Sequence, residues 1–209
     1  MARRLSCGGV ALAWLALAAC AGGPPPNPAD LPTTPLPTAG LAGSEVAVYP
    51  LTMLIAEVEL GWDTVLPPRS EALRQADDLI FTALEARSPE VTWVGPEELR
   101  RAARGAPGML SDPDQMGSSM LRSNIAKVPD PLRAQLRMLT GAVADRYALI
   151  PASALFFADS TTGARVELTL VLVDVRSGDV GWRTVAQGAG DDPWTALRAA
   201  MASLTPGLP

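Results

Sequence analysis

One stretch of the chain decides its fold: Arg165-Val166-Glu167-Leu168-Thr169-Leu170-Val171-Leu172-Val173-Asp174-Val175. Apolar residues alternate along it with a period of two, which predicts a β-strand. The second face of this strand also becomes apolar toward its end, as expected of an inner strand covered by helices. The next residues, Arg176-Ser177-Gly178-Asp179, predict a tight hairpin in which Gly178 is free to adopt a positive φ.

Further strands and helices are predicted on both sides of this hairpin. The other strands are expected at residues 46–51, 91–94, 147–157 and 180–187, with an irregular connection at 53–69. Amphipathic helices are expected at 70–87, 96–103, 131–145 and 192–204, and a short helix capped by Asp112 is expected at 113–122. Without that short helix, the order is β-α-β-α-α-β-β-β-α. It predicts an α/β (α+β) fold with a single mixed sheet of about five strands and helices packed on it.

Residues 1–19 have the pattern of a signal peptide. Arg3 and Arg4 precede an apolar run, residues 10–17, that is shorter than the roughly 20 residues of a membrane span. The following Leu17-Ala18-Ala19-Cys20 resembles the lipobox of bacterial lipoproteins, in which a diacylglyceryl group is attached to the cysteine sulfur and cleavage leaves that cysteine first. The alternative is an ordinary secretory signal cut nearby, with Cys20 an incidental thiol.

The rest of the chain divides into a linker and one folded domain. Residues 20–44 comprise Cys20 and a proline-rich stretch, which we expect to be an extended, semi-rigid stalk because proline fixes φ and lacks a backbone donor. Residues 45–209 are long enough for one domain with its own core.

Composition excludes several classes of function. The chain has no histidine, and its two cysteines are Cys7, in the signal peptide, and Cys20, so we expect no metal, no cofactor and no enzymatic activity. Removing Arg3 and Arg4 from 17 basic residues leaves 15 against 22 acidic ones, a net charge of about −7. No basic cluster predicts nucleic-acid binding, and membrane attachment must come from acyl chains.

Four motifs, in this order, resemble one family of domains. They are Val46-Ala47-Val48-Tyr49-Pro50-Leu51, then Val91-Thr92-Trp93-Val94 with Pro96-Glu97-Glu98-Leu99, then Ala144-Asp145-Arg146-Tyr147-Ala148-Leu149-Ile150-Pro151, and then Asp174-Val175-Arg176-Ser177-Gly178-Asp179-Val180-Gly181-Trp182. The domain is shared by the amino-terminal part of TolB, the curli-secretion lipoprotein CsgG and lipoprotein activators of peptidoglycan synthases. The resemblance implies a non-catalytic module of the cell envelope. The chain departs from it by the insertion 105–130 and by lacking an obvious stretch for transmembrane β-hairpins.

Two groups of residues are candidates for contact with a partner. Trp62 lies in the irregular connection, and we expect it to be exposed, whereas Trp93 and Trp182 lie on strands and are expected to be buried. Met109, Met116 and Met120 lie in the insertion 105–130. They form either an adaptable contact surface or the apolar residues that pin the insertion onto the domain.

The leading hypothesis is a membrane-anchored, non-catalytic binding or scaffolding module with an envelope protein as its partner. Ala21, and not aspartate, follows Cys20. In double-membraned bacteria this favours the periplasmic face of the outer membrane. The alternative is a small-ligand-binding or hydrolytic periplasmic domain with a pocket beneath residues 105–130.

Overall fold

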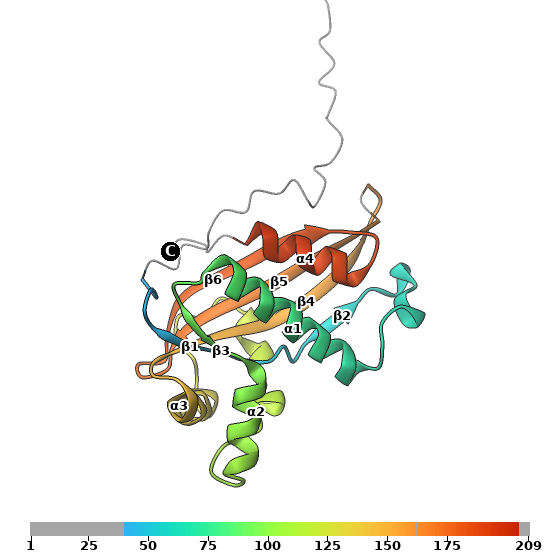
Figure 1. Ribbon diagram of the computed structural model, residues 1–209. Coiled ribbons are helices and arrows are strands. Elements are labelled where there is room, and N and C mark those ends of the chain that lie inside the picture. The colour runs from blue at the N-terminus through green and yellow to red at the C-terminus, as the bar shows by residue number, and fades with distance from the viewer. Residues whose placement is uncertain (1–39, 162, 205–209) are drawn as a thin grey trace, which may run out of the picture.

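The computed structural model describes residues 40–161 and 163–204, and these form an α/β domain around one sheet (Figure 1). The sheet has six strands in the order β3-β1-β4-β5-β6, and β2 also pairs with β4. The strands are β1 (Glu45–Val48), β2 (Leu54–Ala56), β3 (Thr92–Val94), β4 (Tyr147–Asp159), β5 (Gly163–Asp174) and β6 (Asp179–Ala189). The predicted single mixed sheet is confirmed, with one short strand more than expected.

The long strand β4 supports both β1 and β2 on the same side. β1 pairs with it in parallel from Tyr147 to Leu149, and β2 pairs with it in parallel from Ala154 to Phe156. Pro50 lies between β1 and β2, and a residue without a backbone N–H cannot continue a ladder of hydrogen bonds. The connection predicted to be irregular therefore contains a second short strand on β4.

The stretch at residues 165–175 forms most of β5, the inner strand of an antiparallel meander. It pairs with β4 on one side and with β6 on the other. Gly178 closes the hairpin to β6 with a φ of 80°, as predicted.

Two helices cover each face of the sheet. They are α1 (Arg69–Arg87) and α4 (Pro193–Ser203) on one face, and α2 (Pro96–Gly105) and α3 (Leu132–Val143) on the other (Figure 1). Leu168 and Leu170 of β5 point into the core beneath α1 and α4. Val171 and Val173 of the same strand point into the core beneath α2 and α3. The two apolar faces read from the sequence are thus buried in two separate cores.

Glycine allows α4 to approach β6 closely. A Cβ atom on Gly188 would overlap the backbone of Ala196 and Ala200, and one on Gly190 would overlap the backbone of Ala196. Asp192 caps the helix, because its Oδ1 accepts a hydrogen bond from the backbone N–H of Trp194 at 2.9 Å.

Some predicted boundaries are wrong. The helix expected at 113–122 is two 3-10 helices, Pro113–Gln115 and Ser118–Arg122, separated by Gly117 with a φ of 67°. Asp112 does cap the first of them, accepting from the N–H of Asp114 at 3.0 Å. α1 begins at Arg69, one residue before the predicted start, and its N-cap residue Pro68 makes no side-chain capping hydrogen bond.

Several predictions fall outside the described residues. These are the signal peptide, the lipobox residues Leu17, Ala18 and Ala19, the lipidated Cys20 and the linker up to residue 39. Among the residues that the structure describes, no helix has both the length and the apolar character needed to span a bilayer.

Candidate functional site

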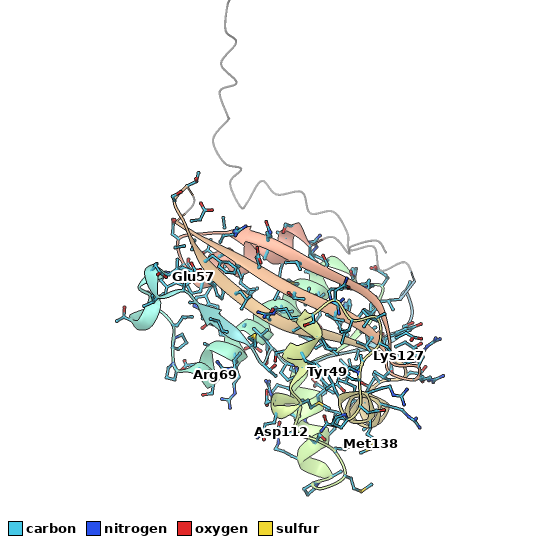
Figure 2. All side chains as sticks on the ribbon, turned by 180° about the vertical axis from the view of Figure 1, so that it is seen from behind. Tyr49, Glu57, Arg69, Asp112, Lys127 and Met138 are labelled. Atoms are coloured by element: carbon cyan, nitrogen blue, oxygen red, sulfur yellow. The ribbon has the colours of Figure 1, made fainter. Side chains whose placement is uncertain are left out.

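A cleft of about 370 Å³ lies between β2 and the start of α1. Its inner wall is apolar, formed by Leu54, Ala56, Trp62, Leu66 and Ala72. Glu57, Val58 and Arg69 line it from exposed positions, and Figure 2 labels Glu57 and Arg69 on this side of the molecule. Concave, mostly apolar sites with a few polar groups are typical of binding sites, so this cleft is the first candidate.

The pairing of β2 with β4 positions the residues of the cleft. The backbone N–H of Glu57 donates to the carbonyl oxygen of Phe156 at 3.0 Å, and its Oε2 accepts from the N–H of Ala158 at 2.9 Å. Gly61 then reverses the chain with a φ of 62°. Two 3-10 helices flank it, Val58–Leu60 and Trp62–Thr64, and they fold back over β4.

The prediction that Trp62 is exposed is wrong. Only 8% of its surface is accessible, and its ring meets Phe156 edge to face at 5.5 Å between centroids. The physical reason is the pairing of β2 with β4. This pairing places the segment that contains Trp62 against the core beneath α1 and α4. Trp62 is thus part of the wall of the cleft. Trp93 and Trp182, predicted to be buried, are half-buried.

A buried ion pair joins α1 to α2 and to the insertion 105–130. Nη2 of Arg100 lies 2.6 Å from Oδ2 of Asp77, and these side chains are 9% and 3% exposed. The same guanidinium donates to Glu97 at 2.9 Å and to Asp114 at 2.7 Å. The other oxygen of Asp77 accepts from the N–H of Leu51 at 2.7 Å. One arginine therefore links α1, α2, the first 3-10 helix of the insertion and, through Asp77, the segment between β1 and β2.

Burial controls the ionisation of Asp77. Desolvation raises the pKa of its carboxyl from 3.8 to about 6, against the opposing effects of the Leu51 N–H and Arg100. The pKa of Arg100 is raised, first by its hydrogen bonds to Asp114 and also by Asp77. Arg100 therefore stays charged at all ordinary pH values, while Asp77 can be protonated in mildly acidic solution.

The methionines of the insertion divide between two roles. Met116 is 6% exposed and belongs to the core beneath α2 and α3, so it pins the insertion onto the domain. Met109 is 73% exposed and Met120 is 47% exposed. These two remain candidates for contact with a partner.

A second cleft, also of about 370 Å³, lies at the insertion, where the sequence suggested a ligand pocket. Arg100, Asp112 and Asp114 line it. Arg100 directs Nε, Nη1 and Nη2 to carboxylates of the chain itself, so these donors are already engaged. Among the residues that the structure describes, no cluster of acidic side chains and cysteines could hold a metal ion.

No protein-family model matches the chain, and a comparison with curated proteins finds no relative. Among solved structures, the LpoB C-terminal domain from Salmonella enterica is similar over 71% of this chain and 84% of its own, with 19% identity and a TM-score of 0.42. The PelC dodecamer from Paraburkholderia phytofirmans matches over 78% and 82%, with 18% identity and a TM-score of 0.33. Lipoprotein GNA1162 from Neisseria meningitidis matches over 70% and 80%, with 15% identity and a TM-score of 0.33.

These likenesses are partial. The structures named above include LpoB and the lipoprotein GNA1162. TolB and CsgG are not among the structures named above, so that part of the resemblance stays a prediction. Because each TM-score is below 0.5, no role is transferred from these proteins.

The sequence contained a signal for the buried ion pair. Asp77 falls on the stripe of α1 that also carries Ala76, Ile80 and Leu84, all of them buried. An acidic residue on the apolar face of a helix predicts a buried partner. The partner itself was not readable, because Arg100 is 23 residues away and on another helix.

Proposed function

We propose that this chain is a lipid-anchored, non-catalytic binding module of the bacterial cell envelope that docks a partner protein. The observation that carries the proposal is a succession in the sequence: a signal-peptide pattern, Leu17-Ala18-Ala19-Cys20, a proline-rich linker and then one folded domain. Acyl chains on Cys20 would hold the protein at the membrane. The linker would set the distance from the membrane at which the domain works.

The net charge supports an anchor of this kind. Without residues 1–19 the chain would carry a net charge of about −7. An acidic body is repelled by anionic lipid, so charge alone cannot keep it at a membrane. Ala21, the residue after Cys20, favours the periplasmic face of the outer membrane in a double-membraned organism.

The surface of the folded domain supports docking of a protein. Val58 is 78% exposed beside the apolar wall of the cleft, and Met109 and Met120 are exposed on the insertion. Methionine adapts to partners of varied shape. Arg100, the buried cation next to the insertion, is held by carboxylates of the chain, which suits a structural role.

Metabolic labelling with a palmitate analogue tests the anchor. The wild-type chain should incorporate the label, and Cys20→Ala should abolish it. Cys7→Ala is the matched control, because Cys7 lies within the predicted signal peptide and its loss should leave labelling unchanged. Equal labelling of Cys20→Ala and wild type would refute the proposed anchor.

Crosslinking of the lipidated protein in its native envelope tests the docking role. A specific protein adduct above the background of an unrelated lipoprotein is expected. Recovery of the chain free of any specific adduct would count against a binding module.

A further inference from the structure

The outer edge of β2 is open. Its neighbour β4 donates from Ala154 N–H to the carbonyl oxygen of Met53 and accepts from the N–H of Glu57. In a parallel pair, alternate residues direct both backbone groups toward the neighbouring strand. Residues 53, 55 and 57 therefore face β4, and the backbone groups of Leu54 and Ala56 point to the other side.

The row of the sheet beyond β2 is filled only in part. β3 occupies this row alongside β1, where it pairs with Glu45, Val46 and Ala47. β3 ends at Val94. In the ranges 40–161 and 163–204, no strand pairs with β2 on that side. The sheet thus has an empty strand position next to Leu54 and Ala56.

The empty position coincides with the apolar cleft. Leu54 and Ala56 line the cleft together with Trp62 and Leu66. A strand added to β2 would therefore place every second side chain against Trp62 and Leu66, because side chains alternate along a strand.

The surroundings of the cleft are acidic. Glu57 lines the cleft, and Glu59 and Glu71 are exposed next to the lining residues Val58 and Ala72, whereas Arg69 is the basic residue of the lining. A complementary segment would carry basic side chains, since like charges opposite one another are disfavoured and opposite charges are favoured across an interface.

We propose that the outer edge of β2 receives an extended segment of the partner protein as an added strand, with small apolar side chains in the cleft and basic side chains toward Glu57 and Glu59. Strand addition of this kind obtains affinity from backbone hydrogen bonds and specificity from alternate side chains. This inference rests on the proposed docking function and names its surface.

The opposite edge of the sheet is less suited to strand addition. The start of β6 is already covered, because Val128 N–H donates to Gly178 and Val180 N–H donates to Ala126. The side chain of Arg183 on β6 also donates to the carbonyl oxygens of Leu121 and Ile125. β2 is therefore the edge that has an empty strand position beside it, an apolar cleft and acidic surroundings.

A short synthetic peptide of alternating lysine and valine is the probe, added to the full lipidated chain in detergent micelles. Amide hydrogen exchange is read by NMR at Leu54 and Ala56. Saturating peptide should slow exchange at both amides at least about tenfold, whereas the same peptide with alternate backbone nitrogens methylated should not. Unchanged exchange at both amides, or protection confined to β6, would overturn the proposal.

Substitutions separate the backbone contact from the charge contact. Ala56→Pro removes the outward N–H without touching the ladder to β4, since edge strands tolerate proline at such positions, and should weaken peptide binding about fivefold or more. Ile55→Ser is its control, because Ile55 is exposed on the opposite face of the sheet and binding should persist. Glu59→Lys should weaken binding about threefold. Glu85→Lys makes the same change of charge on α1, away from the residues that line the cleft, and should leave peptide binding unchanged.

The remaining outcomes are also decisive. Equal binding by wild type and Ala56→Pro would exclude an added strand. Protection of Leu54 and Ala56 that rises with protein concentration in the absence of peptide would assign the edge to a second copy of this chain and overturn the partner assignment. Because the peptide assay does not depend on labelling at Cys20, it can fail while the anchor is demonstrated, and the reverse also holds.

Discussion

Replacing Arg100 with methionine should destabilise the domain strongly. Methionine keeps most of the length of the side chain but removes every donor. Asp77, only 3% exposed, would then keep the N–H of Leu51 but lose its positive partner. Breaking a buried ion pair by removing one member typically costs about 3–5 kcal/mol, because the remaining charge is left uncompensated. Glu97 and Asp114 are about half exposed and add less, under about 1 kcal/mol each.

The loss should depend on pH in a definite direction. Burial raises the pKa of Asp77 to about 6, so the folded state binds this proton more tightly than the unfolded state. The contribution of this proton to the free energy of unfolding is fully present below about pH 4. It is lost as the pH rises through about 6. Without Arg100 the pKa of Asp77 should rise further. The cost of Arg100→Met should therefore be largest near neutral pH and should shrink in mildly acidic solution.

Urea unfolding followed by tryptophan fluorescence measures this effect. The matched control is Arg101→Met, because Arg101 is the next residue on α2, is exposed and lies 3.5 Å from the exposed Glu98. That variant should change the free energy of unfolding by less than about 1 kcal/mol. If Arg100→Met cost no more than Arg101→Met, or if its cost grew on acidification, the argument from the buried pair would be refuted.

Two other predictions concern packing. Trp62→Ala should lower the free energy of unfolding by about 3–5 kcal/mol, because the ring is buried against Phe156, whereas Val58→Ala, at an exposed position nearby, should change it by less than about 0.5 kcal/mol. Similar losses for both would disprove the burial of Trp62. Gly188→Ala should cost at least about 2 kcal/mol because its Cβ would displace α4, whereas Gly141→Ala, exposed on α3 with open space around it, should be neutral or stabilising. Both pairs can be measured by thermal or urea unfolding.

The parts of the fold that were predictable from sequence have strong local patterns. Residues 165–175 alternate in two apolar sets, and each set is buried in its own core. The hairpin at Gly178 was predictable because its φ of 80° suits glycine. Such patterns indicate where a strand lies and how many of its faces are covered.

The features of the fold that the sequence did not predict depend on contacts between residues far apart in the chain. β2 has three residues, which are too few for a periodic pattern. It forms because it pairs with residues 154–156 of β4. The exposure predicted for Trp62 failed for the same reason. The insertion was expected to contain a continuous helix, but Gly117 adopts a left-handed conformation and divides it.

The candidate site was only partly readable. Trp62 was selected as a possible contact residue, and the structure places it in the wall of the cleft. The cleft itself requires β2 and the start of α1 to be side by side, which no local pattern specifies. Asp77 falls on the apolar stripe of α1, which the sequence pattern shows. Its burial next to Arg100 depends on how α1 and α2 pack.

Mass spectrometry of the chain purified from its native membrane tests the central claim most directly. The account predicts that residues 1–19 are absent and that Cys20 is the first residue, carrying a diacylglyceryl group on its sulfur. A chain that retains residues 1–19, or whose Cys20 carries an unmodified thiol, would contradict it.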